Sequence, residues 1–155
     1  MKNELAFHGK PMRVELSVAA KKAALALSSK LIIEIQIYFS CMLGKRLAFY
    51  ADQPLSGSCQ VEAGLFATMV DDSQQLVDKL FVRFNTVMTV NCPVSDYDGP
   101  PPVTDFQIHN KRPYVPDWLN IDFKNGVWSG EYGWASSDHA QRNTRQINSY
   151  ALKIK

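Results

Sequence analysis

The sequence predicts an α+β fold, a curved antiparallel β-sheet of six to eight strands with one or two helices packed on one face. Long runs alternate between apolar and polar side chains, as half-buried strands do. An Asn-Gly pair at positions 125 and 126 separates two such runs, which is typical of a tight hairpin. Residues 19–29 and 72–83 have helical composition or spacing. These observations together favour strands with a minority of helix.

The longest alternating run covers residues 30–43. Its odd-numbered side chains from position 33 onward are apolar and are expected in a core. Residues 13–18 alternate in the same way and are expected to form an earlier strand. The even-numbered side chains of the long run are expected in solvent: Glu34, Gln36, Tyr38 and Ser40.

The chain is then expected to turn back and continue the sheet. Gly44-Lys45 predicts a tight turn, residues 46–52 return, and residues 60–70 form a third extended run. Before these strands, residues 1–11 are expected to be a loosely held arm ending at Pro11. Residues 19–29, between the first two strands, are either a short helix or the frayed ends of two strands.

A helix is predicted after Asp71-Asp72-Ser73, which could cap its first free N–H groups. Apolar side chains between positions 76 and 84 lie at helical spacing, and from Val82 onward a strand pattern competes. We therefore predict a helix over residues 72–83 that leads into a strand ending near Asn91.

The C-terminal part begins with a proline-rich loop at residues 92–103, because consecutive prolines cannot lie within a helix or a central strand. Residues 104–109 are a candidate edge strand. Residues 118–123 and 127–134 are predicted to form a hairpin that turns at Asn125-Gly126. The tail, residues 136–155, is predicted to be a helix followed by a last strand.

Composition bounds the function. A chain of 155 residues with 46% hydrophobic and 21% charged residues is typical of one globular domain. Its net charge of +2 and dispersed Lys and Arg argue against nucleic-acid binding. No apolar run reaches the ~20 residues of a membrane-spanning helix, and the first residues lack a signal-peptide pattern. We therefore expect a cytoplasmic protein.

Three segments show similarity to a known family: residues 14–18 (V-E-L-S-V), 33–37 (I-E-I-Q-I) and 61–66 (V-E-A-G-L-F). They resemble the first strands of SecB, the bacterial preprotein-export chaperone, although the third segment is one residue shorter than the family pattern. The resemblance implies an assembled protein that holds unfolded polypeptides. SecB chaperones are acidic and dock through carboxylates, so the net charge of +2 leaves that docking outside what the resemblance implies.

No catalytic or metal-binding motif is present. The three histidines and three cysteines lack ligand spacing, so neither a metal nor another cofactor is expected. Carboxylates near the proline-rich loop could line a pocket, although Asp is also favoured in turns. These alternative pocket acids are Asp96, Asp98 and Asp105.

Aromatic residues gather in the same part of the chain. Three of them share one face of the strand at residues 127–134, where they could either pack in the core or form an open platform for a ligand. The candidate ligand-binding residues are Tyr114, Trp118, Trp128, Tyr132 and Trp134.

Two functions follow from these patterns. The first is a non-enzymatic, chaperone-like module that holds an apolar or extended polypeptide on a sheet face or groove. The alternative is a small-molecule-binding barrel or cystatin-like cone, with enzymatic activity left open. A homodimer is expected, because the predicted apolar faces exceed what one layer of helix can cover.

Overall fold

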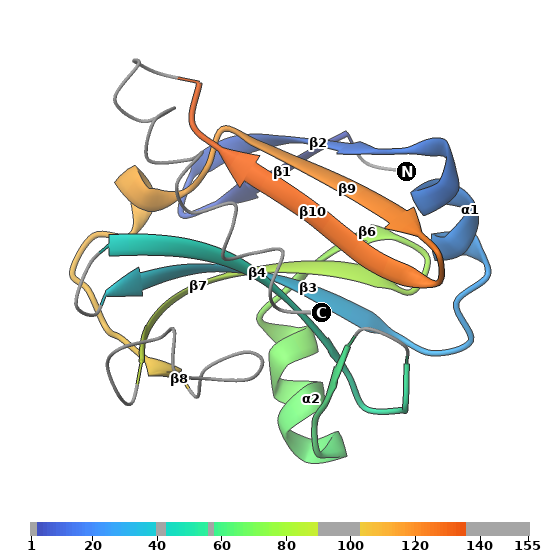
Figure 1. Cartoon of the computed structure of the whole chain (residues 1–155). Helices are drawn as coiled ribbons and strands as arrows, with labels where there is room; N and C mark the ends of the chain where they lie inside the picture. The colour runs from blue at the N-terminus through green and yellow to red at the C-terminus, as the bar shows by residue number, and fades with distance from the viewer. Residues whose placement is uncertain (1–2, 40–42, 56–57, 90–102, 136–155) are drawn as a thin grey trace.

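The computed structural model describes residues 3–39, 43–55, 58–89 and 103–135. Two β-sheets lie face to face (Figure 1). One sheet has four strands in the order β1-β2-β9-β10; the other has six, in the order β5-β4-β3-β7-β6, with β8 paired to β7. The α+β class is thus confirmed, and the described strands form no closed barrel. Both sheets are mixed, because strands distant in sequence pair in parallel.

β1 (Glu4–Phe7) and β2 (Lys10–Leu16) form an antiparallel hairpin. Its turn is His8-Gly9, where both residues have positive φ, 52° and 77°. Two-residue turns of this kind match the twist of the flanking strands. The expectation of a loose N-terminal arm is therefore wrong from residue 4 onward, since alternate side chains of both strands are buried.

β9 (Trp118–Lys124) and β10 (Val127–Gly133) form the predicted C-terminal hairpin. Asn125 and Gly126 make its turn, with φ of 53° and 78°. This prediction is confirmed. β9 also pairs in parallel with β2, so the two hairpins at opposite ends of the described chain share one sheet.

β3 (Leu31–Phe39) is the centre of the six-stranded sheet. It pairs antiparallel with β4 (Leu43–Ala51) and parallel with β7 (Leu80–Thr89). The short β5 (Cys59–Gln60) lies beside β4. β8 (Val103–Asp105) pairs with β7 as the predicted edge strand, which ends earlier than expected.

The predicted turn at Gly44-Lys45 is wrong. Both residues lie inside β4, opposite Tyr38 and Ile37 of β3. Strand pairing over most of β3 and β4 overrides the local turn preference of one glycine.

α1 (Val18–Leu25) decides between the two alternatives for residues 19–29 in favour of a helix. The Oγ of Ser17 caps it by accepting a hydrogen bond from the N–H of Ala20 at 3.1 Å. Ala20 and Ala24 are completely buried against the core, which closes one end of the space between the sheets.

α2 (Ala63–Asp71) replaces the predicted third strand at residues 60–70. The segment compared with a SecB strand is therefore mostly the start of a helix. The helical signal was present, because Leu65, Phe66, Met69 and Val70 lie at i, i+1, i+4 and i+5. Phe66 and Met69 pack on the face of the six-stranded sheet that is turned away from the other sheet.

The predicted helix at residues 72–83 is also wrong. Ser73 ends α2 instead of starting a helix: its Oγ donates to the carbonyl of Val70 at 2.6 Å. β6 (Gln74–Val77) then pairs antiparallel with β7. Asp78 has a positive φ of 44° in the connection between these strands. The strand pattern noted from Val82 onward is confirmed, and the strand itself begins at Leu80.

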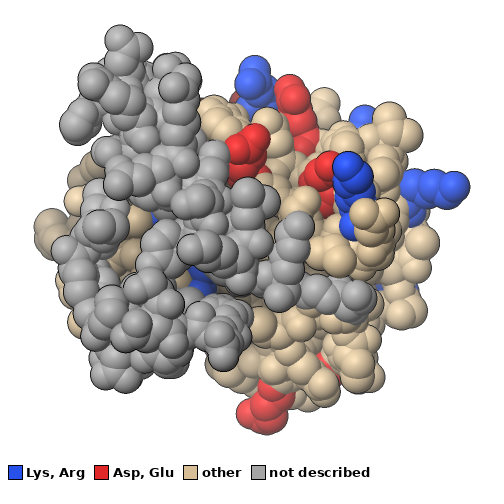
Figure 2. Space-filling view, in the orientation of Figure 1, with Lys and Arg blue, Asp and Glu red and all other residues tan. Residues whose placement is uncertain are grey.

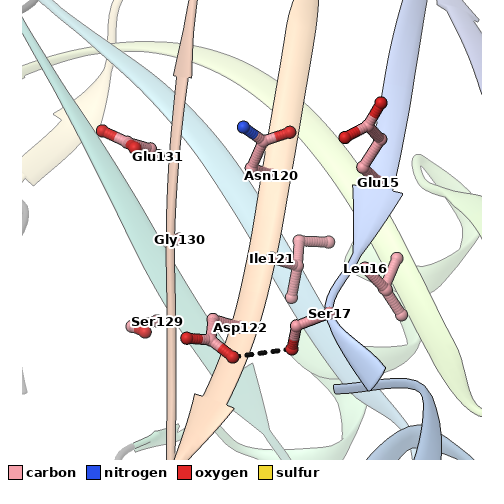
Figure 3. A pocket seen from close by; sticks show the side chains of 9 residues that line it. All are labelled: Glu15, Leu16, Ser17, Asn120, Ile121, Asp122, Ser129, Gly130 and Glu131. Carbon is pink, nitrogen blue, oxygen red and sulfur yellow. Dashed lines mark hydrogen bonds between the residues drawn. The ribbon is translucent and has the colours of Figure 1, made fainter. Parts of the chain in front are cut away.

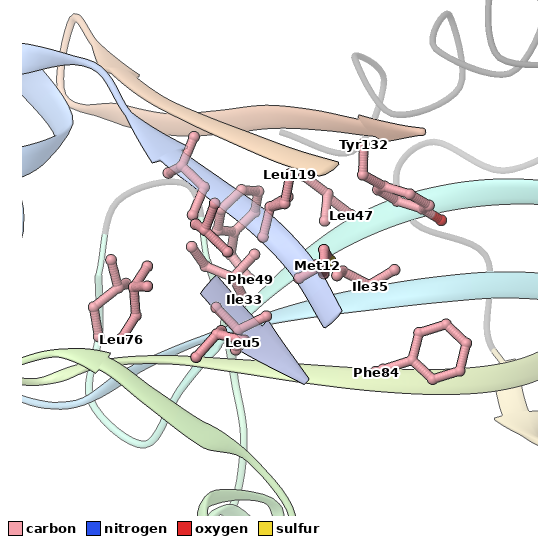
Figure 4. Close-up of a cluster of buried hydrophobic side chains, with 14 of the residues drawn as sticks. Leu5, Met12, Ile33, Ile35, Leu47, Phe49, Leu76, Phe84, Leu119 and Tyr132 are labelled. Atoms are coloured by element: carbon pink, nitrogen blue, oxygen red, sulfur yellow. The ribbon is translucent and has the colours of Figure 1, made fainter. Parts of the chain in front are cut away.

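The main core lies between the sheets (Figure 4). Each buried aliphatic or aromatic side chain there stabilises the fold by roughly 1.5–3 kcal/mol. Leu5, Met12 and Leu119 come from the four-stranded sheet and meet Ile33 and Leu47 of the other. Neither described helix is long and apolar enough to cross a membrane. The predicted C-terminal helix and strand, and most of the proline-rich loop, lie outside the described residues.

Candidate functional site

The outer face of the six-stranded sheet contains buried polar side chains. Glu34 is 3% exposed and Gln36 is completely buried, whereas both were expected in solvent. That expectation is wrong for Tyr38 as well. Both faces of β3 are therefore buried. We call this surface the polar face and define it by eight residues: Glu34, Gln36, Tyr38, Arg46, Tyr50, Arg83, Asn85 and Asp105.

Strand register brings these residues together. Gln36 lies opposite Arg46 of β4 on one side and opposite Asn85 of β7 on the other. Glu34 lies opposite Arg83 in the same way. Residues paired directly across neighbouring strands project to the same side of a sheet. β3, β4 and β7 thus contribute polar side chains to one continuous surface, to which β8 adds Asp105.

The amide of Gln36 links the two sides of this surface. Its Oε1 accepts a hydrogen bond from Nε of Arg46 at 2.7 Å. Its Nε2 donates to Oε1 of Glu34 at 2.7 Å and to the hydroxyl of Tyr50 at 3.0 Å. The orientation of this amide is thereby determined by its neighbours.

The two arginines of the polar face differ in their charge balance. Arg83 forms an ion pair with Glu34 through Nη1, and its Nε bonds to Oδ2 of Asp72 at 3.0 Å. These carboxylates raise the pKa of Arg83 against the opposing effect of burial. Arg46 is only 1% exposed and has no carboxylate partner among the described residues. Its guanidinium lies over the ring of Tyr38 at 4.9 Å.

One donor of Arg46 has no acceptor in the described part of the chain. Nη1 is buried and forms no hydrogen bond there. A buried charge without a counter-charge and a buried donor without an acceptor both cost free energy. This position is therefore the strongest indication of a missing partner among the described residues.

Tyr50 adds a second donor. Burial, with the negative charge of Glu34, raises the pKa of Tyr50 to about 12. Its hydroxyl is therefore protonated at neutral pH. That oxygen accepts from Gln36, and among the described residues its proton has no acceptor.

The aromatic residues predicted from the sequence lie elsewhere, toward the core. Trp128 is 4% exposed and Tyr132 1%, so the packed alternative holds for both. Tyr114, Trp118 and Trp134 are partly buried. Nε1 of Trp134 donates to the carbonyl of Val115 at 3.1 Å.

Three of these rings surround Lys45. Its Nζ lies 4.7 Å from the ring centre of Tyr132 and 5.9 Å from those of Trp118 and Trp134. Nζ also donates to the carbonyl of Tyr132. Burial lowers the pKa of Lys45 to about 8, and the charge of Glu131 opposes this effect.

Asp105, one of the three predicted pocket acids, lies at the polar face, where its Oδ1 accepts from Nδ2 of Asn85 at 2.8 Å. Asp96 and Asp98 lie outside the described residues. Arg46 and Gln36 were not predicted as site residues. Arg46 directly follows the predicted turn at Gly44-Lys45, and Gln36 lies on the face of its strand that was expected in solvent. Adjacent Lys45 and Arg46 inside an otherwise apolar strand were the available signal.

A second concave surface lies on the outer face of the four-stranded sheet (Figure 3). This groove of about 480 Å³ is lined by β2, β9 and β10, with exposed Glu15, Asn120, Asp122 and Glu131. The hydroxyl of Ser17 donates to Asp122 at 2.6 Å, and this bond and the N–H of Phe123 lower the pKa of that carboxyl. None of the described polar atoms lining the groove is both buried and unpartnered.

Neither the surface charge of the described residues nor the comparison with known proteins indicates another site. Described Lys and Arg side chains are interspersed with Asp and Glu on the face in Figure 2, without a basic patch. Among the described residues, no group of three or more His, Cys, Asp or Glu is placed to hold a metal ion. Comparisons with protein-family models, curated proteins and solved structures found no match.

Proposed function

We propose that the protein is a non-enzymatic binding protein that holds a small carboxylate on the polar face. The observation that carries this proposal is the buried guanidinium of Arg46, which has no counter-charge among the described residues and leaves Nη1 without an acceptor there. A bound anion would supply both the negative charge and the acceptor.

The two arginines differ in their ion pairs, and this difference favours a ligand with one negative group. Arg83 forms ion pairs with Glu34 of the polar face and with Asp72 beside it. Arg46 forms no ion pair with a described residue, so one negative group could pair with it. A planar carboxylate fits this requirement, because the guanidinium group offers donors in the plane that a carboxylate accepts.

Tyr50 supports the same ligand class. Its hydroxyl and Nε of Arg46 bond to opposite ends of the Gln36 amide. The Tyr50 hydroxyl and the Arg46 guanidinium are thus neighbours of the same side-chain amide, and one small ligand could contact both. Since Tyr50 is protonated at neutral pH, it can donate to the second oxygen of a carboxylate.

The network also extends toward solvent. Asp72 and Asp105 are exposed, and Tyr50 is only partly buried. Asp72 contacts Arg83 and Asp105 contacts Asn85, whereas Tyr50 connects to Arg46 through the amide of Gln36.

This proposal takes the small-molecule alternative over a polypeptide platform. The platform depended on exposed rings, and Trp128 and Tyr132 pack in the core. Polypeptide holding stays a prediction.

The test is a titration of the full chain with sodium acetate and sodium benzoate, followed by thermal unfolding and calorimetry, with sodium chloride at equal ionic strength as reference. We expect a carboxylate to raise the melting temperature and chloride to leave it unchanged. Arg46→Lys keeps the charge but loses Nη1, so it should weaken binding at least tenfold. The matched control is Arg13→Lys, at an exposed arginine.

Two results would overturn the proposal. One is that neither carboxylate stabilises the wild-type protein beyond chloride. The other is that Arg46→Lys binds as tightly as wild type. If Arg46→Lys does not fold, Tyr50→Phe serves instead, because it removes only a partly buried hydroxyl. Unchanged carboxylate affinity in Tyr50→Phe would contradict the role given to that donor.

A further inference from the structure

The hydroxyl of Tyr132 lies between the backbones of β3 and β4. It donates to the carbonyl of Gln36 at 2.5 Å and accepts from the N–H of Arg46 at 3.1 Å. The carbonyl of Arg46 is 3.3 Å away. Gln36 and Arg46 are directly paired in the strand register. A side chain from the other sheet thus joins the ladder at the pair whose side chains form the centre of the polar face.

Tyr132 is held firmly in this position. Its side chain is 1% exposed and points from β10 toward β4 (Figure 4). The carbonyl of the same residue accepts from Nζ of Lys45. Side chain and backbone of Tyr132 therefore contact two successive residues of β4, one facing the core and the other facing the polar face.

We infer that Tyr132 is the positioning residue of the anion site and couples that site to the packing of the four-stranded sheet. This inference rests on the proposed function. The hydroxyl, together with the carbonyl that accepts from Lys45, positions β4 against β3 at Gln36 and Arg46, and this position determines how the guanidinium meets the Gln36 amide. By linkage, an anion bound to Arg46 strengthens the contact between β10 and β4 by the same factor.

Removal of the hydroxyl would allow a specific rearrangement. Without it, the carbonyl of Gln36 and the N–H of Arg46 each lose one hydrogen-bond partner. The backbones of β3 and β4 could then shift relative to each other at this pair. The hydrogen bond from Nε of Arg46 to Gln36, 2.7 Å long, would change in length or angle, and Nη1 would move with it.

The experiment compares Tyr132→Phe with Tyr114→Phe in the full chain. Tyr114 is the matched control, because its ring packs against Phe39 while its hydroxyl has no hydrogen-bond partner among the described residues. Two quantities are measured: acetate affinity, and the NMR chemical shift of the Arg46 Nε–H group without ligand. We expect Tyr132→Phe to weaken acetate binding at least fivefold and to shift the Nε–H signal. Tyr114→Phe should do neither.

The two measurements separate the inference from the proposed function. If wild type binds acetate and Tyr132→Phe binds it equally with an unmoved Nε–H signal, the positioning role is overturned and the binding function stands. If wild type binds no carboxylate, the binding function fails, and the Nε–H signal still tests the positioning role. Should Tyr132→Phe not fold, Lys45→Met releases the Tyr132 carbonyl instead. An unmoved Nε–H signal in Lys45→Met would then overturn the inference.

Discussion

The side-chain amide of Gln74 in β6 bonds to both backbone groups of Ala6 in β1. The N–H of Ala6 donates to Oε1 of Gln74 at 3.4 Å, and Nε2 of Gln74 donates to the carbonyl of Ala6. β1 and β6 are edge strands of opposite sheets. Unpaired groups on an edge strand invite pairing with another chain. The amide occupies these groups at one residue and ties the two sheets together along this side.

Replacement of Gln74 by Ala tests this link. We expect a loss of about 1 kcal/mol in the free energy of unfolding, because two hydrogen bonds at an exposed position are removed. Amide hydrogen exchange at Ala6 should become faster. Gln107→Ala, at an exposed glutamine without a described hydrogen bond, is the control. Equal stability and equal exchange in both variants would show that the amide does not hold the edge.

Gly126→Val should destabilise the C-terminal hairpin. Gly126 has a φ of 78°, which a β-branched residue resists. A Cβ at this position would have no described atom within 4 Å, so the cost comes from the backbone alone. We expect a loss of about 1 kcal/mol or more, measured by chemical denaturation. Lys124→Val, at the end of β9 just before the turn, should be close to neutral. A Gly126→Val variant as stable as wild type would contradict the turn assignment.

Glu34→Gln tests the buried ion pair with Arg83. Among the described ion pairs, the substitution leaves Arg83 with the exposed Asp72, so we expect a loss of roughly 2–4 kcal/mol. The matched control is Glu15→Gln, which breaks the exposed pair with Arg13 at 3.7 Å. That change should cost less than about 0.5 kcal/mol. Similar losses in the two variants would mean that burial gives the Glu34 pair no special role.

The lowered pKa of Lys45 should make the free energy of unfolding depend on pH. Its pKa is about 8 in the folded protein and 10.5 when exposed, so between these values the unfolded chain binds more protons. Stability from this group therefore rises with pH above 8, on the order of 1–2 kcal/mol by about pH 9.5. The measurements should stop near this pH. Above about pH 10 the raised pKa of Tyr50 lowers the free energy of unfolding and opposes the effect of Lys45.

Denaturation of wild type and Lys45→Met at about pH 7.5, 8.5 and 9.5 measures this effect. The difference in stability between the two proteins should shrink or change in favour of wild type as pH rises. A constant difference would show that Lys45 does not titrate in this range. The contacts of Lys45 with the rings of Tyr132 and Trp118 favour its charged form in the folded protein. They therefore reduce the gain in stability with pH.

Local patterns predicted several elements correctly. The hairpin at Asn125-Gly126 was predictable because only its own two residues need positive φ. The segment at residues 60–70 was predicted as a strand and is mostly helix, and the segment at residues 72–83 was predicted as a helix and forms strands. Short apolar runs fit both periods, and pairing of β6 with β7 decided between them. The expected dimer stays a prediction, although the four-stranded sheet now covers Ile33 and Ile35, two of the side chains on which it depended.

The sequence by itself determined the α+β class, the C-terminal hairpin and the alternation of β3, since each depends on the conformational preferences of neighbouring residues. Tertiary structure alone decided that Glu34 and Gln36 are buried. Alternation places polar side chains on one face of a strand, but it does not say whether that face meets water. Arg46 and Arg83, from strands β4 and β7, bring the donors and charges that make burial of those side chains possible. The proposed anion site depends on the meeting of these three strands, which no local pattern encodes.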